Sequence, residues 1–162
     1  MYFDKKAVLN MLDELNIVYE HKEHSAAFTL DEMMELRLPY EENIAKNLFI
    51  RNDKKQNYYL LTIAGGKRAD LKKVRNFLGE RPLKFASEED LDKIMGLKKG
   101  SVTPFGILND SESKVKVLMD RAYRGKIIGV HPNDNTATVW LKTEDLMNII
   151  ISRGNEAEYI EI

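Results

Sequence analysis

The segment Tyr58–Ile63 constrains the fold of this chain more than any other. Its residues are aromatic, aliphatic or β-branched, which is typical of a strand. A strand with one face in water alternates polar and apolar residues, and this segment does not. Polar turn residues separate it from an alternating strand that ends at Arg51 and follows an acidic helical turn. The sequence therefore predicts a hairpin whose second strand is too apolar to have a polar face.

Five helices are predicted from capping residues followed by apolar side chains at three- and four-residue spacing. The second of them opens with the capping box Thr29–Glu32. Three of the helices end at a glycine, the residue that most readily adopts a left-handed conformation. The predicted N-caps are Asp4, Thr29, Asp70, Ser87 and Thr143, and the matching ends are Asn16, Pro39, Gly79, Gly96 and Gly154.

The order of helices and strands indicates the fold class. Further strands are predicted at residues 17–21, 115–119, 126–130 and 137–141, with an edge strand at 157–162. Helices and strands do not alternate strictly, as they would in a doubly wound fold, and there is no glycine-rich dinucleotide or phosphate motif. We predict one α+β domain over residues 1–162, with a mixed, mainly antiparallel sheet and flanking helices.

Composition excludes several classes of function. The chain has 25 basic and 26 acidic residues, so any bound polyanion must be held by a local patch. Cysteine is absent, which rules out thiolate chemistry and metal–thiolate sites and fits a reducing cytoplasm. No run approaches the roughly 18 apolar residues of a membrane span. We expect a cytoplasmic protein with no membrane association, metal or other cofactor; His21 and His24 alone do not make a metal site.

Three short motifs suggest a ligand site. They are Lys46–Phe49 entering a strand, Gly100–Gly106 after a helix, and Gly129–Asn133 before a strand. Glycine lets backbone N–H groups approach a ligand closely, and proline stiffens a loop. Taken singly, each motif is more often an ordinary turn or loop than a binding site. Their order along the chain is more specific than any one of them.

In that order, the three motifs resemble the signature of the YbaK/prolyl-tRNA-editing superfamily, and within it the chain is most similar to the free-standing Ala-tRNA(Pro) deacylases. The resemblance covers nearly the whole chain. It implies a barrel-like mixed sheet and hydrolysis of alanine wrongly attached to proline tRNA. The implied partners are aminoacylated tRNA(Pro) and, as a second candidate, prolyl-tRNA synthetase. Two alternatives remain open: a deacylase for another small or sulfur-containing aminoacyl group, such as Cys-tRNA(Pro), and a catalytically silent tRNA-binding relative.

The resemblance also implies roles for the motif residues. The lysine at position 46 contacts substrate, the loop beginning at Gly100 holds the acyl end, and His131 lies beside the pocket. The chemistry of these residues is compatible with that, because a lysine can hold a phosphate or oxyanion, loop amides can stabilise an oxyanion, and a histidine can orient water or a ribose hydroxyl. The expected catalytic residues are Lys46, Gly100 and His131, and the expected substrate-binding residues are Asn47, Ser101, Val102, Thr103, Pro104 and Phe105.

A basic segment and several aromatic residues are further candidates for RNA contact. A solvated helix face is the better explanation of the basic segment, and core or sheet-surface packing is the better explanation of the aromatic residues. If they bind RNA, the basic side chains track phosphates and one aromatic ring stacks on the terminal adenine. The basic residues are Lys67, Arg68, Lys72, Lys73 and Arg75, and the aromatic residues are Phe49, Tyr58 and Tyr59.

Overall fold

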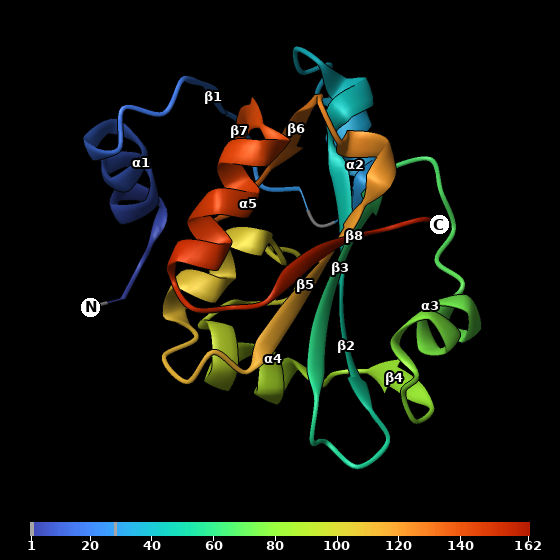
Figure 1. Ribbon diagram of the computed structural model, residues 1–162. Coiled ribbons are helices and arrows are strands. Elements are labelled where there is room, and N and C mark those ends of the chain that lie inside the picture. Colours follow the sequence, from blue (N-terminus) through green and yellow to red (C-terminus); the bar gives the residue numbers. More distant parts are fainter. Residues whose placement is uncertain (1, 28) are drawn as a thin grey trace.

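The computed structural model describes residues 2–27 and 29–162 and contains two β-sheets (Figure 1). The five-stranded sheet has the order β4-β2-β3-β5-β8 and the three-stranded sheet the order β1-β7-β6. The strands are β1 (Tyr19–Glu23), β2 (Ala45–Asn52), β3 (Tyr58–Ala64), β4 (Leu83–Phe85), β5 (Val115–Asp120), β6 (Ile127–Val130), β7 (Ala137–Lys142) and β8 (Ala157–Ile160).

The sheets confirm the predicted fold class but form no closed barrel within the described residues. Four of the six strand pairings are antiparallel, and only β3–β5 and β5–β8 are parallel. A single parallel bridge between Ile44 and Gly129 joins the two sheets. The barrel-like closure that the resemblance implied is therefore reduced to one point of contact, and the outer edge of β2 stays open between this bridge and β4.

Helix caps follow the sequence closely. Asp4, Thr29, Asp70 and Ser87 each accept a hydrogen bond from a backbone N–H in the first turn of their helix. The prediction for the last helix is wrong by one residue: Lys142 is its N-cap, and the Thr143 hydroxyl instead donates to the carbonyl of Lys126 at 2.8 Å. The helices are α1 (Lys5–Glu14), α2 (Leu30–Glu35), α3 (Leu71–Leu78), α4 (Glu88–Met95) and α5 (Thr143–Ser152), with 3₁₀ turns η1 (Glu41–Asn43), η2 (Pro104–Asn109) and η3 (Arg121–Tyr123).

The five-stranded sheet is covered on both faces, as the composition of β3 requires. One face packs against α4, α5 and the three-stranded sheet in the main core, and the other packs against α3 (Figure 1). In β3, Leu60 faces the main core and Leu61 the α3 side, and both are fully buried. The apolar run Tyr58–Ile63 is thus the centre of a three-layer arrangement.

The first strand and the edge strand β4 differ most from the prediction. The first strand begins at Tyr19 and not at Ile17, because the backbone N–H of Ile17 still bonds Leu12 at the end of α1. The edge strand β4 was not predicted, since it has only three residues and its last side chain, Phe85, is 60% exposed. Short, exposed edge strands have no alternating pattern from which they could be recognised.

Gly129 allows the two sheets to meet. An added Cβ at this position would lie 2.6 Å from Nε1 of Trp140 and 3.2 Å from Cγ1 of Ile44. We predict that Gly129→Ala lowers the free energy of unfolding by about 1–3 kcal/mol, because the close-packed contact must open. Urea denaturation measures this. Gly66→Ala is the control, since no heavy atom lies within 4 Å of its added Cβ; equal stability of the two variants would contradict the prediction.

Candidate active site

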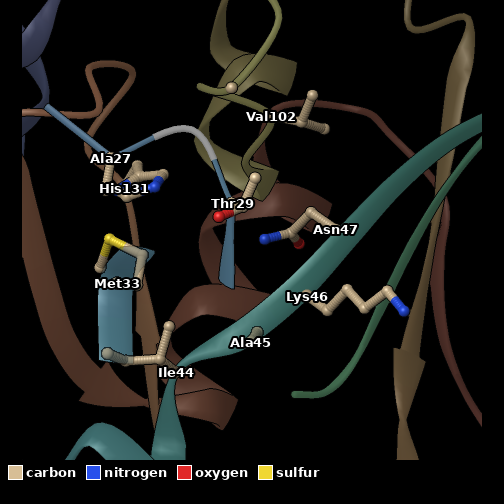
Figure 2. Close-up of a pocket in the computed structure, with 10 residues that line it drawn as sticks. Ala27, Thr29, Met33, Ile44, Ala45, Lys46, Asn47, Val102 and His131 are labelled. Atoms are coloured by element: carbon tan, nitrogen blue, oxygen red, sulfur yellow. The ribbon is translucent and has the colours of Figure 1, made fainter. Parts of the chain in front are cut away.

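A cavity of about 200 Å³ lies where the three sequence motifs meet (Figure 2). It is bounded by the start of β2, by α2 and the segment before it, by the loop after α4, and by the loop between β6 and β7. The lining residues are Ala27, Thr29, Met33, Ile44, Ala45, Lys46, Asn47, Gly100, Val102 and His131. The structure therefore brings together five of the nine residues expected to act in catalysis or substrate binding.

Two hydrogen bonds clamp the loop after α4 to the loop after β6. The hydroxyl of Thr103, which is fully buried, donates to the carbonyl of His131 at 2.6 Å. The side-chain amide of Asn133 donates to the carbonyl of Phe105 at 3.2 Å and to that of Phe3 at 2.8 Å. We call the two bonds that join the loops, Thr103 to His131 and Asn133 to Phe105, the loop clamp. It fixes the position of His131 relative to Gly100 across the cavity.

His131 is held as a neutral hydrogen-bond acceptor. Its Nδ1 lies 2.9 Å from the carbonyl of Ala137, and because a carbonyl only accepts, Nδ1 carries the hydrogen and Nε2 has the free lone pair. Burial lowers the pKa of His131 below its usual value of about 6.5, and the nearby His24 ring, 6.2 Å away between centroids, acts in the same direction. The imidazole is therefore uncharged at neutral pH and suited to accept a hydrogen bond.

Lys46 and Asn47 point to opposite faces of β2, since successive side chains of a strand alternate. The Oδ1 of Asn47 accepts a hydrogen bond from the buried hydroxyl of Thr62 at 2.7 Å, which leaves the Nδ2 group free to donate. Figure 2 shows this nitrogen turned towards Thr29, whereas the Lys46 side chain extends away from His131. Lys46 shares its face with Leu48, which packs on the α3 side of the sheet. Only the backbone end of Lys46 thus adjoins the cavity.

Gly100 lines the cavity, and its backbone N–H is a candidate donor for a ligand. Its φ of 88° lies in the left-handed region, where a side chain would strain the backbone. Among the described residues, nothing accepts a hydrogen bond from the Gly100 N–H, whereas the N–H of Ser101 donates to the carbonyl of Lys98 at 3.0 Å. The sequence points to the loop amides of Gly100 and Ser101 as oxyanion donors, and of these two the described residues leave only that of Gly100 without an acceptor.

The second half of the glycine-rich loop is part of the core. Thr103 is fully buried, Phe105 is 1% exposed, and Pro104 begins the 3₁₀ turn η2. Neither these three residues nor Ser101 lines the cavity. Of the loop, only Gly100 and Val102 reach the cavity. The sequence could not predict this, because a pattern of glycine and proline does not reveal where a loop turns inward.

The basic segment is divided by its contacts. Lys67 bonds the buried carboxylate of Asp120 at 3.0 Å and the carbonyl of Ile162, and Arg75 bonds the carbonyl of Glu80 at 3.1 Å. These two cations hold the fold together. Within the described part of the chain, Arg68, Lys72 and Lys73 have no ion pair or side-chain hydrogen bond, and all three are exposed.

Five lining residues were not predicted as site residues: Ala27, Thr29, Met33, Ile44 and Ala45. Met33, which is 3% exposed, is the largest apolar one and comes from the short helix α2. The capping box at Thr29 predicts that helix, and the Lys46 motif follows it closely. Periodicity alone does not say what an apolar helix face packs against, so the sequence points to the glycine-rich loop and not to Met33.

Comparisons with known proteins identify the family of this chain. The model of the aminoacyl-tRNA editing domain family matches residues 24–149. The prolyl-tRNA editing protein ProX of Acetoanaerobium sticklandii is 42% identical over 159 residues, covering 98% of this chain and 97% of that protein. Mouse prolyl-tRNA synthetase associated domain-containing protein 1 is 30% identical, covering 90% of this chain and 88% of its own.

A solved structure supports the same fold. It is that of a candidate trans-editing enzyme for prolyl-tRNA synthetase, with a TM-score of 0.72, 20% identity, and coverage of 98% of this chain and 96% of that one. The fold and the convergent motifs define an editing domain. The chain belongs to the aminoacyl-tRNA editing domain family, and the predictions of the superfamily and of an editing enzyme are confirmed. Every helix in residues 2–27 and 29–162 is too short or too polar to span a membrane.

The loop clamp generates a prediction about stability. Thr103→Val keeps the volume but leaves the His131 carbonyl without its buried donor, so we expect the free energy of unfolding to fall by about 1–3 kcal/mol. Thr103→Ser retains the hydroxyl and is expected to lie closer to wild type. Urea denaturation compares the three proteins. A valine variant more stable than the serine variant would show that methyl packing matters here and the hydrogen bond does not.

Proposed function

We propose that this protein is a trans-editing hydrolase that cleaves the ester bond of mischarged Ala-tRNA(Pro). The observation that carries the proposal is that Gly100, Asn47 and the neutral acceptor His131 line one small cavity, together with the apolar side chains of Met33, Ile44 and Val102. The 42% identity to a prolyl-tRNA editing protein supports the same substrate class. The proposed substrate is therefore an aminoacylated tRNA(Pro), and the proposed partner is prolyl-tRNA synthetase, which releases it.

The site provides positioning and charge stabilisation. An aminoacyl ester is already activated, so the enzyme must place a water molecule and stabilise the oxyanion of the tetrahedral intermediate. We assign the oxyanion contacts to the Gly100 N–H and the Asn47 amide. His131 Nε2 accepts a hydrogen bond from the attacking water or from a ribose hydroxyl. Thr62 holds the Asn47 amide in the orientation that this requires.

Selection of the amino acid is proposed to be steric. Met33, Ile44 and Val102 give the cavity an apolar wall, and its volume of about 200 Å³ is shared with the attacking water and part of the ribose. A methyl side chain fits such a space, whereas a pyrrolidine ring adds volume that a close-packed wall resists. A synthetase pocket shaped for proline excludes a smaller side chain by only about 1–3 kcal/mol, which makes this second sieve useful.

The direct test is release of amino acid from Ala-tRNA(Pro), Pro-tRNA(Pro) and Cys-tRNA(Pro). We expect alanine to be released fastest and proline to be spared. Val102→Ala should raise hydrolysis of the prolyl ester relative to the alanyl ester, because the shortened wall admits the ring. Val18→Ala is the matched control, since Val18 is 81% exposed and does not line the cavity.

The possible outcomes separate the candidate functions. Faster release of cysteine than of alanine would identify a deacylase for the sulfur-containing substrate. Binding of tRNA without release of any amino acid would identify a silent tRNA-binding relative. A folded Val102→Ala protein with an unchanged preference would contradict steric selection by this wall.

Lys46 and the exposed part of the basic segment are proposed to bind tRNA phosphates. The Lys46 side chain points away from His131, so it suits the phosphate of the terminal nucleotide better than the oxyanion of the acyl group. Arg68, Lys72 and Lys73 are free to follow the acceptor stem. Lys67 and Arg75 contribute positive potential, but their side chains already hold Asp120 and the Glu80 carbonyl.

Salt dependence tests these contacts. We predict that Lys46→Gln and Lys72→Gln each reduce the slope of log(kcat/KM) against log salt by about 1, because one released counterion fewer accompanies binding. At saturating tRNA, kcat should change little. Lys54→Gln in the β2–β3 turn, also an exposed lysine, is the control. An unchanged slope with a large fall in kcat for Lys46→Gln would place this lysine on the oxyanion instead.

A further inference from the structure

A second, larger groove adjoins the cavity. It has a volume of about 410 Å³, and Asn47 and Val102 line both it and the cavity. Phe49, Phe85 and Lys99 are among its lining residues, and Phe85 is exposed. A group attached to a substrate in the cavity can reach this groove by passing Asn47 and Val102.

The groove lies along an unpaired stretch of the β2 edge. At one end of this edge, Ile44 forms the bridge to Gly129, and at the other, the Ala86 N–H donates to the carbonyl of Phe49. Backbone groups of alternate residues in a strand point to the same edge, so the N–H and C=O of Asn47 point the same way as those of Phe49. In the described residues no strand pairs with Asn47 on that side. The backbone N–H and C=O of Asn47 thus offer one donor and one acceptor side by side on the outer edge of β2.

The chemistry of the groove fits a nucleobase. A base offers a flat face for stacking on an aromatic ring and a polar edge with a donor and an acceptor. Phe85 is 60% exposed on the edge strand β4, whereas Phe49, Tyr58 and Tyr59 are each less than 10% exposed and closed to stacking. Of these aromatic rings, Phe85 is therefore the one positioned to stack.

The charges on the rim are compatible with a neutral base flanked by phosphate. The Lys99 ammonium lies 3.8 Å from the Glu88 carboxylate, and the two side chains are 82% and 72% exposed. Such an exposed pair contributes little, so Lys99 is free to turn to a phosphate. Glu88 would repel a phosphate on its own side but not an uncharged base. Ser87 also lines the groove, and its hydroxyl already accepts a hydrogen bond from the Asp90 N–H as the N-cap of α4.

We infer that this groove binds the adenine of the terminal adenosine, with Phe85 stacked on the base and the Asn47 backbone at its polar edge. The inference rests on the proposed function, because it places the acyl group of the same nucleotide in the cavity. It assigns recognition of the nucleoside to β4 and the β2 edge, separately from recognition of the amino acid.

The test compares two small esters: 3′-O-alanyl adenosine 5′-phosphate and the same alanyl ester of ribose 5-phosphate without a base. We expect Phe85→Ala to lower kcat/KM for the adenosine ester about tenfold and to leave the base-free ester unchanged. Phe77→Ala on α3 is the matched control, since Phe77 is also exposed, at 46%, and lies outside the groove. Equal kcat/KM of wild type and Phe85→Ala for the adenosine ester would overturn the inference.

A binding measurement separates this inference from the proposed function. Adenosine 5′-phosphate is titrated into wild-type protein and both variants, and binding is followed by NMR shifts of backbone amides. Saturable binding that is about tenfold weaker in Phe85→Ala supports the groove even if neither ester is hydrolysed, in which case only the proposed function fails. Hydrolysis of esters together with unaltered nucleotide binding in Phe85→Ala overturns the inference and leaves the proposed function standing.

Discussion

The site depends on one hydrogen bond between distant segments, from the hydroxyl of Thr103 to the carbonyl of His131, 28 positions apart. The Thr103 side chain is removed from water, where an unpaired polar group is costly, so the bond specifies how the two loops meet. Asn133 strengthens the same junction by bonding Phe105. With the loops fixed, Gly100 and His131 line one cavity.

The side chains of β2 alternate between the two faces of the sheet, so neighbouring residues have different surroundings. Asn47 faces the cavity and is oriented by Thr62, whereas Lys46, one residue earlier, faces the opposite side of the sheet. A single strand can therefore serve the reacting ester with one side chain and the nucleic acid with the next. The gap in its edge pairing, between the Ile44 bridge and β4, lets a substrate approach the backbone as well.

Local signals made most of the fold predictable. The caps Asp4, Asp70 and Ser87 and the uniformly apolar β3 are consequences of neighbouring residues, and the structure confirms them. The absence of a closed barrel, the inward turn of the loop at Thr103 and the place of Met33 in the cavity wall depend on long-range packing. Such packing leaves no mark in local sequence. The three motifs meet at one cavity, but which of their side chains reach it is set by that packing.

The central claim is that the cavity between the clamped loops holds the acyl group. The most direct measurement is a crystal structure with an amide analogue of 3′-alanyl adenosine, in which nitrogen replaces the ester oxygen and prevents hydrolysis. The account predicts the alanine methyl between Met33 and Val102, with the carbonyl oxygen within hydrogen-bond distance of the Gly100 N–H and the Asn47 amide. An analogue bound with its alanyl group outside this cavity would contradict the account.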